Sequence, residues 1–276
     1  MREKKRIKTV VVEIITIMIG IIYVYPVLIV FTNTFKPLGE ILKNPFSFPE
    51  SLYLDNLNYV FGTMNYMRIL WNTLVIAIVV VLLCILLTSM AGWMLTRDGS
   101  KKSRIITMLF LSSLLVPFQS FIIPIAKMAN SMHINNTISG YIWIQVTLYA
   151  PMGIFMYQGF TKNVPISLEE SARLDGANPF KVYAYIVFPL MKPITTSIAV
   201  LYSLWIWNDY LLASIMLHSE SKKTITISIY AFYSMYNNRG DYAITAVALS
   251  IIPITIVYLL LQKYIISGIT AGAVKG

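Results

Sequence analysis

Six long apolar stretches, separated by polar connections, constrain this chain more than any other feature of its sequence. A bilayer core about 30 Å thick is crossed by about twenty apolar residues, because a helix rises about 1.5 Å per residue. Stretches of that length occur at residues 10–31, 73–94, 105–125, 138–160, 194–217 and 242–261. Prolines inside them, such as Pro26 and Pro151, are tolerated as kinks in a membrane bundle. The sequence predicts an all-α integral membrane protein with six transmembrane helices.

The composition excludes an ordinary water-soluble fold. Hydrophobic residues make up 57% of the chain and charged residues only 12%, whereas soluble domains contain about 45–50% apolar and about 25% charged residues. Lipid rather than water must therefore cover much of the exterior. We expect residues 1–276 to form a single transmembrane domain.

The positive charges predict the orientation of the spans. The first apolar stretch follows MREKKRIK, is longer than a signal-peptide core and precedes no small-residue cleavage site, so we expect a retained span with its N-terminus inside. In that orientation fifteen of the 22 lysines and arginines lie on the cytoplasmic side and seven lie outside. The positive-inside rule then favours six spans with both termini cytoplasmic. The net charge of +10 needs no nucleic acid to explain it.

Catalytic and metal-binding motifs are missing from the sequence. Cys84 is the single cysteine, and the two histidines, His133 and His218, lie in separate connections without metal-ligand spacing. The spans contain no G-x-S-x-G and no paired carboxylates at helical spacing. An intramembrane enzyme is therefore an alternative that no catalytic motif supports. No G-x-x-x-x-G-K-[ST] loop occurs either. We expect no catalytic residue and no metal site, and any ATP must be hydrolysed by another chain.

The outer connection, residues 32–72, predicts one short amphipathic helix on the membrane surface. Apolar residues follow Asp55 at the i, i+3, i+4 and i+7 positions of a helix, namely Leu57, Val60, Phe61 and Met64. This helix either supports the bundle or receives an external partner.

The inner connection, residues 161–193, predicts a first short helix. Ser167 and Glu170 have the S-x-x-E spacing of a capping box, so a helix should begin there. Gly176 is the residue type that ends a helix in the left-handed conformation. A two-turn helix is too short to be stable by itself, so we expect it to be held by packing.

A second short helix should follow directly. Asn178 is a good N-cap and Pro179 a good first helical residue. We expect this helix to end near Phe188, because Pro189 disfavours helical geometry in the residue before it.

The same connection carries a recognisable motif. The motif residues are Glu170, Ser171 and Ala172, then Gly176 after three residues, Ile186 after nine more, and Phe188 with Pro189 after one more. This pattern resembles the EAA loop (EAA-x3-G-x9-I-x-LP) of the membrane subunits of binding-protein-dependent ABC importers. Ser171 replaces an alanine of the motif and Phe188 a leucine. Further matches lie at residues 72–74, 91–97, 207–209 and 267–276. Together they are similar to the maltose-permease-G-like subunits of carbohydrate importers.

The resemblance implies the type I ABC importer permease fold, in which a coupling helix at 168–175 is seated in a cleft of an ATPase subunit. The coupling residues it implies are Leu168, Glu169, Glu170, Ser171, Ala172, Arg173, Asp175 and Gly176. Glu170 would be the charged anchor and Gly176 the turn that permits docking, while the tail 268–276 would reach between two ATPase subunits.

The partners follow from the same resemblance. They are a second homologous permease, two cytoplasmic ATPase subunits that hold ATP and Mg²⁺, and an external sugar-binding protein, while this chain holds no cofactor. The complex would lie in the plasma (inner) membrane and import sugar by alternating access.

The fifth stretch contains candidate contacts to the substrate. At about 100° per residue, one helix face carries Tyr202, Trp205, Asn208 and Asp209, and Trp207 falls opposite. Aromatic planes beside an amide and a carboxylate suit a sugar, although the same residues also suit bundle packing.

An ion-coupled secondary transporter subunit is the alternative function. Such carriers usually need ionisable groups near the bilayer midplane, whereas Glu13 and Asp209 lie toward the ends of their stretches. The chain also lacks an evident duplicated half.

Overall fold

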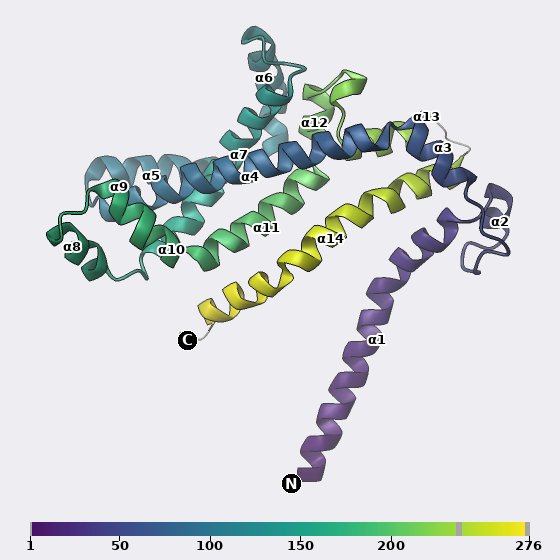
Figure 1. The fold of residues 1–276 in the computed structure, drawn as a ribbon, viewed down its shortest axis with the longest axis horizontal. Helices are drawn as coiled ribbons and strands as arrows, with labels where there is room; N and C mark the ends of the chain where they lie inside the picture. The colour runs from purple at the N-terminus through teal and green to yellow at the C-terminus, as the bar shows by residue number, and fades with distance from the viewer. Residues whose placement is uncertain (1, 236–238, 274–276) are drawn as a thin grey trace. The chain divides into compact units, whose positions relative to one another are not determined.

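The structure, a computed structural model, describes residues 2–235 and 239–273, and every element in these ranges is helical (Figure 1). The elements are α1 (Arg2–Thr34), α2 (Leu38–Lys43), α3 (Asp55–Thr63), α4 (Tyr66–Arg97), α5 (Lys101–Ser113), α6 (Phe118–Ser131), α7 (Ile138–Thr161), α8 (Ile166–Leu174), α9 (Pro179–Val182), η1 (Tyr183–Val187), α10 (Phe188–Leu190), α11 (Lys192–Asn208), α12 (Leu211–Met216), η2 (Glu220–Lys222), α13 (Ile225–Met235) and α14 (Gly240–Ala273). The prediction of an all-α protein is confirmed.

Four helical segments are long and apolar enough to cross a membrane. They are Thr9–Thr34 of α1, Tyr66–Arg97, Ile138–Thr161 and Gly240–Leu260 of α14. Two bent pairs pass the same test together, namely Lys101–Ser113 with Phe118–Ser131, and Pro179–Leu190 with Lys192–Asn208. If each pair forms one span, the described part of the chain has up to six spans, which is the number that the sequence predicts.

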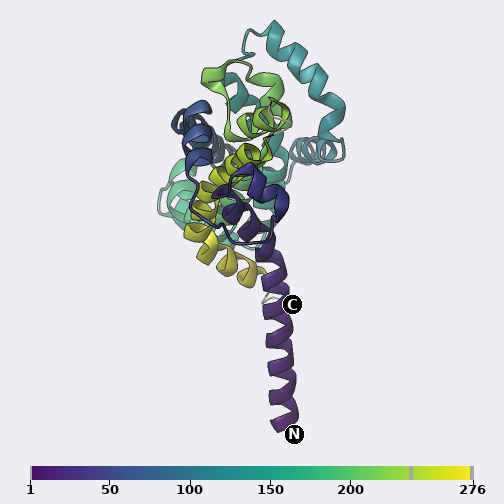
Figure 2. The ribbon, with the colours of Figure 1, turned by 90° about the vertical axis from the view of Figure 1, so that its right-hand side faces the viewer.

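The stretch 105–125, expected to be one span, is sharply broken. Helices α5 and α6 meet at an angle of 103°, and Figure 2 shows α6 turning away from α5. Pro117 lies at the break with an extended backbone and occupies the N-cap position of α6. A proline cannot donate the backbone hydrogen bond that would continue α5, so the chain turns there.

The stretch 194–217 is likewise two helices. Helix α11 ends at Asn208 because Asp209 takes an extended backbone conformation. The Asp209 Oδ1 atom then accepts a hydrogen bond from the Leu212 backbone N–H at 3.3 Å, in the first turn of α12. Asp209 therefore separates two helices instead of continuing one.

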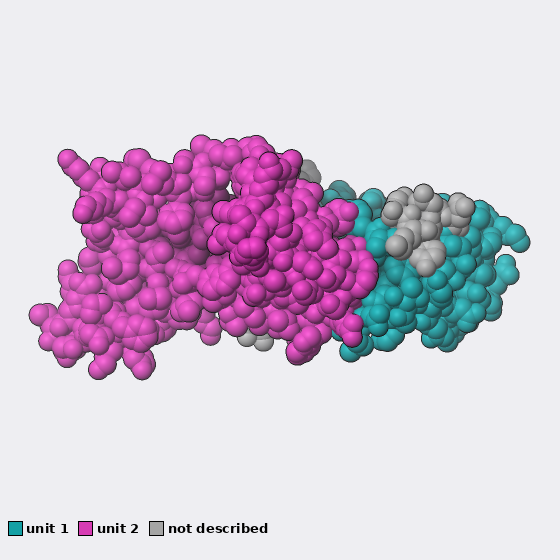
Figure 3. Space-filling model, turned by 90° about the horizontal axis from the view of Figure 1, so that it is seen from above, with its two compact units in different colours: residues 1–67, 228–253 teal, residues 68–227, 254–276 magenta. Residues whose placement is uncertain are grey.

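The chain divides into two compact units, shown in Figure 3. Unit 1 contains Met1–Met67 and Ser228–Pro253, and unit 2 contains Arg68–Ile227 and Ile254–Gly276. In unit 1 the short helix predicted after Asp55 is present as α3, with Val60 and Met64 buried and Phe61 exposed, and its position on the membrane surface stays a prediction. The expectation of a single transmembrane domain stays a prediction.

Unit 2 contains a close approach of α4 and α7. A Cβ added to Gly92 would lie 2.6 Å from Cβ of Tyr157, and one added to Gly153 would lie 2.6 Å from Oγ1 of Thr88. Glycine lets two apolar helices come together at such distances, as is common in membrane bundles. Helix α4 is therefore closely packed along its C-terminal half, where the candidate site begins.

Candidate functional site

Helix α8 is the first short helix predicted in the inner connection. It begins at Ile166 after Pro165, whose carbonyl accepts from the Leu168 backbone N–H at 3.3 Å. The predicted capping box of Ser167 and Glu170 is wrong, because no side chain caps this helix. Pro165 sets the start instead, and Ser167 already lies inside the first turn.

The end of α8 agrees with the prediction. Gly176 has a φ of +84°, and its N–H donates to Arg173 O at 3.1 Å while the Ala177 N–H donates to Ala172 O at 2.9 Å. This is the Schellman arrangement, which glycine favours because it has no Cβ. The chain reverses there, so α8 is a short projecting helix.

The second predicted helix begins as expected and ends later than expected. Asn178 Oδ1 accepts from the Lys181 N–H at 2.9 Å, and Pro179 is the first residue of α9. The predicted end near Phe188 is wrong, since the helical path continues through Pro189 to Leu190. The reason is η1, a π-helical segment in which the Phe188 N–H donates to Tyr183 O. A π turn is wider than an α turn and relieves the clash that a proline ring makes one turn back.

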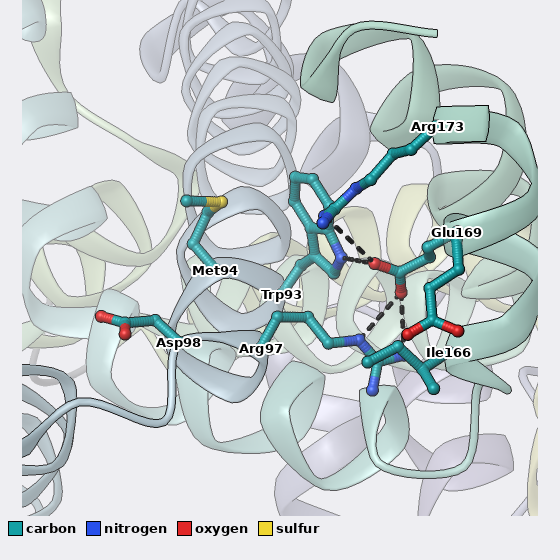
Figure 4. A pocket seen from close by; sticks show the side chains of 8 residues that line it. Trp93, Met94, Arg97, Asp98, Ile166, Glu169 and Arg173 are labelled. Carbon is teal, nitrogen blue, oxygen red and sulfur yellow. Dashed lines mark hydrogen bonds and ion pairs between the residues drawn. The ribbon is translucent and has the colours of Figure 1, made fainter. Parts of the chain in front are cut away.

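Glu169 turns inward from α8 toward the end of α4. Its side chain is 1% exposed. Its Oε2 accepts from Trp93 Nε1 at 3.0 Å, and its Oε1 accepts from Arg97 Nε at 2.8 Å and lies 2.8 Å from Arg97 Nη2 (Figure 4). We call Trp93, Arg97 and Glu169 the inner clasp. It pairs a buried carboxylate with a guanidinium and an indole, which is a charge-assisted arrangement.

Helix α4 also holds the connection on both sides of Glu169. Arg97 Nη2 donates to Val164 O at 2.7 Å, just before α8. The Tyr183 hydroxyl lies 2.6 Å from Ser89 Oγ, and the Tyr183 ring lies 5.6 Å from that of Trp93. The support that we expect for a short helix therefore comes from side-chain contacts with α4 and from packing against α9 and η1.

The opposite face of α8 is exposed. Leu174, at its end, is 89% exposed, and Phe180 on α9 is 67% exposed. Among the predicted coupling residues, Glu169 is buried and Ala172 is half-buried. The exposed ones are Leu168, Glu170, Ser171, Arg173, Asp175 and Gly176. The structure thus separates two neighbouring carboxylates, with Glu169 inside and Glu170 outside.

A second site surrounds Asp209. A cavity of about 440 Å³ is lined by residues of α5, α6, α7, α11 and α12 and by Asp209 between the last two, and its lining includes Gln145, Tyr149 and Trp205. Asp209 Oδ2 accepts from the Tyr141 hydroxyl at 2.5 Å and from Gln145 Nε2 at 2.7 Å. The cavity is therefore lined both by aromatic rings and by a carboxylate whose hydrogen-bond donors are neutral.

The structure brings two of the four predicted substrate residues to this cavity. Trp205 and Asp209 line it. Tyr202 is fully buried and donates from its hydroxyl to Tyr149 O at 2.7 Å. Asn208 is exposed and donates from Nδ2 to Leu204 O of its own helix at 2.8 Å, and Trp207 is buried. The single-face prediction assumed a continuous helix, which ends before Asp209.

Sequence reasoning missed four residues of these sites. Trp93 and Arg97 lie in the matched stretch 91–97, yet nothing in that stretch points to Glu169 as their partner. Tyr141 and Gln145 are polar residues four apart in an apolar stretch, so they share a helix face. That spacing was a signal for a polar site in α7.

Comparisons with known proteins point to one family. The profile of the family described as "Binding-protein-dependent transport system inner membrane component" matches residues 85–271. The chain is 35% identical to the "Probable starch degradation products transport system permease protein AmyC" of Thermoanaerobacterium thermosulfurigenes, over 94% of each protein. It is 33% identical to the "Multiple sugar-binding transport system permease protein MsmG" of Streptococcus mutans serotype c, over 93% of each.

A solved structure supports the same fold. The chain superposes with a TM-score of 0.81 on a chain of a bacterial ABC transporter involved in the import of the acidic polysaccharide alginate. The match covers 95% of this chain and 97% of the other, at 19% sequence identity. The helices of this chain therefore have the same fold as that chain of the alginate transporter.

Proposed function

The chain belongs to the family of binding-protein-dependent transport system inner membrane components, and we propose that it is the sugar permease subunit of an ATP-driven importer whose ATPase docks on α8. As a member of this family it is a multi-pass membrane transporter component and not an enzyme. The finer assignment rests on the exposed face of α8 and on the Asp209 cavity.

The exposed face of α8 is the observation that carries the proposal. Leu174 projects an apolar side chain that is 89% exposed, and its burial in a partner would stabilise the complex by about 1.5–3 kcal/mol. Glu170, Arg173 and Asp175 surround it with charges of both signs. A short helix that is fixed on one side and exposed on the other suits a cleft in an ATPase subunit.

The remaining partners complete the proposed assembly. The sequence has no phosphate-binding loop, so ATP and Mg²⁺ belong to two cytoplasmic ATPase subunits. A second homologous permease forms the other half of the path, and an external binding protein delivers the sugar. Both termini of this chain are cytoplasmic in this proposal, and the complex lies in the plasma (inner) membrane.

The Asp209 cavity is the proposed stretch of the substrate path in this chain. Its volume of about 440 Å³ lies within the range of about 300–1,000 Å³ typical of ligand pockets. Tyr149 and Trp205 offer ring faces to a sugar, and Asp209 offers an acceptor for hydroxyl groups. The name of the relative AmyC refers to starch degradation products, and the name of MsmG refers to multiple sugars.

Replacing Leu174 with Asp, or Glu170 with Ala, tests the docking face. Each variant should remain in the membrane, while ATPase co-purification or the coupling of ATP hydrolysis to sugar uptake falls about tenfold. The matched control is Leu52→Asp, which places the same charge at a leucine that is 75% exposed in unit 1. If both α8 variants retain the ATPase and import sugar normally, the docking assignment is wrong.

A further inference from the structure

Helix α4 is held by polar contacts at both ends. At its inner end, Trp93 and Arg97 hold Glu169 of α8. Toward its outer end, Asn72 Nδ2 donates to the carbonyls of Ser221 and Lys223, at 2.9 and 3.1 Å. Residues 72–97 span about 38 Å at about 1.5 Å per residue. One helix therefore links α8 to the segment around η2.

The contacts continue from that segment to the Asp209 cavity. The Ile225 N–H donates to Thr73 Oγ1 at 3.0 Å, which fixes the start of α13 to α4. The next residue, Thr226, donates from Oγ1 to the carbonyl of Asp209 at 2.7 Å. A continuous series of contacts thus joins the inner clasp, α4, the start of α13 and Asp209 within unit 2.

Between these two ends α4 contains no proline, and its one glycine, Gly92, is closely packed against Tyr157. Helix kinks arise at prolines, at small-residue pairs or at π-bulges. Helix α4 therefore has no proline break between its two sets of polar contacts.

The inner clasp orients α8 as well as holding it. A carboxylate that accepts from an indole and a guanidinium is fixed in both position and direction. Arg173 adds a more distant contact to Glu169 Oε2, at 4.0 Å, and Figure 4 shows Trp93, Arg97 and Arg173 all directed toward this carboxylate. Glu169 is thus the side chain of α8 that is bound to α4, while its neighbour Glu170 is exposed.

We propose that Glu169 is a positioning residue for transport, which binds α8 to α4 so that the two helices move as one body when the ATPase moves. The inference rests on the proposed function, because it takes α8 as the helix that receives the ATPase. Glu169 itself contacts neither the ATPase nor the sugar.

The test is Glu169→Gln in the reconstituted complex with its ATPase, partner permease and binding protein. Glutamine keeps the shape and one acceptor oxygen but removes the charge opposite Arg97. ATPase co-purification and the rate of ATP hydrolysis should stay within about twofold of the parent, while sugar transported per ATP falls at least tenfold. Glu50→Gln makes the same change at an exposed outer glutamate and should leave transport per ATP unchanged.

A distance measurement tests the clasp without reference to transport. Spin labels at Met90→Cys on α4 and Ser167→Cys on α8 occupy exposed positions, and Cys84 is buried and does not compete for the label. The distance distribution should be narrow in the parent complex and broad in Glu169→Gln. The Glu50→Gln control should keep the narrow distribution.

The double variant Arg97→Gln and Glu169→Gln guards against misfolding, because it leaves no unpaired buried charge. If the clasp acts as a unit, the double variant should lose transport per ATP to the same extent as Glu169→Gln alone. Parent-like transport and a narrow distance distribution in Glu169→Gln would overturn the proposal, and so would loss of the ATPase from that variant, which would place Glu169 in docking. Failure of the proposed function shows instead in the Leu174 and Glu170 variants, which leave Glu169 unchanged.

Discussion

Two carboxylates of unit 2, Glu169 and Asp209, are satisfied in different ways. Glu169 has a guanidinium as its main partner, whereas Asp209 has a phenol, an amide and a backbone N–H. Among the described residues, the ion pairs include Glu169 and do not include Asp209. One carboxylate is matched by a positive charge and the other only by neutral donors.

The difference separates a structural role from a binding role. A buried carboxylate paired with a cation is costly to separate, so Glu169 holds its helix in place. Asp209 borders a cavity and keeps only neutral partners, which a sugar hydroxyl can replace without separating opposite charges. The comparison predicts that stability depends on the first carboxylate and transport selectivity on the second.

The largest expected effect on stability comes from Arg97→Ala. It removes the nearer guanidinium and leaves the buried Glu169 carboxylate with the Trp93 indole and the more distant Arg173, at a cost of up to about 3–5 kcal/mol. Thermal unfolding of the purified complex should show a lowered midpoint, and the double variant Arg97→Ala with Glu169→Leu should recover much of it. A midpoint unchanged in Arg97→Ala would mean that the ion pair contributes nothing.

A smaller effect on stability and a larger one on selectivity is expected for Asp209→Asn. The amide keeps the shape but has one acceptor oxygen in place of two, so either the Leu212 N–H or the Tyr141 and Gln145 donors lose their acceptor, at a cost of about 1–3 kcal/mol. Sugar uptake should fall about tenfold or change its preference among sugars, with the unfolding midpoint lowered less than in Arg97→Ala. Uptake and stimulated ATPase activity in proteoliposomes measure this. A destabilised protein with normal uptake would reverse the comparison.

The smallest effect is expected for Asn208→Ala. Asn208 is one residue from Asp209, but its side chain is exposed and bonds to its own helix. Uptake should change less than twofold, while Trp205→Ala, at the cavity wall, should reduce it more. A tenfold loss in Asn208→Ala would place this residue on the substrate face that the sequence predicts.

The sequence predicts most of the helices because their causes are local. Apolar length predicts the spans, and Gly176, Asn178 and Pro179 predict their own turns through backbone preferences. Pro117 and Asp209 break two stretches that hydropathy alone treats as continuous. Hydropathy averages over about twenty residues and does not register where one backbone N–H is lost or one side chain caps a new helix.

The two sites are less predictable because their contacts are distant in sequence. Glu169 and Arg97 are 72 residues apart, so nothing in the motif tells which glutamate of the pair turns inward. The capping box was expected from Ser167 and Glu170, yet Pro165 begins the helix and leaves Glu169 on the buried side. To predict the partners of Asp209 on α7, one would have to know that α7 packs beside the end of α11.

The π-helical segment η1 has a consequence for helical phase. A π segment is equivalent to one residue inserted into an α-helix, and one residue corresponds to a rotation of about 100°. Tyr183 and Val187 are both buried at its two ends, whereas Tyr185 between them is exposed. Deleting Tyr185 would remove the residue that this wider turn accommodates, and the Pro189 ring would then meet the carbonyl one turn back. Such a deletion would retain the contact of Tyr183 with α4 but would break the helical path at Pro189, because the π turn is what lets the helix continue through this proline.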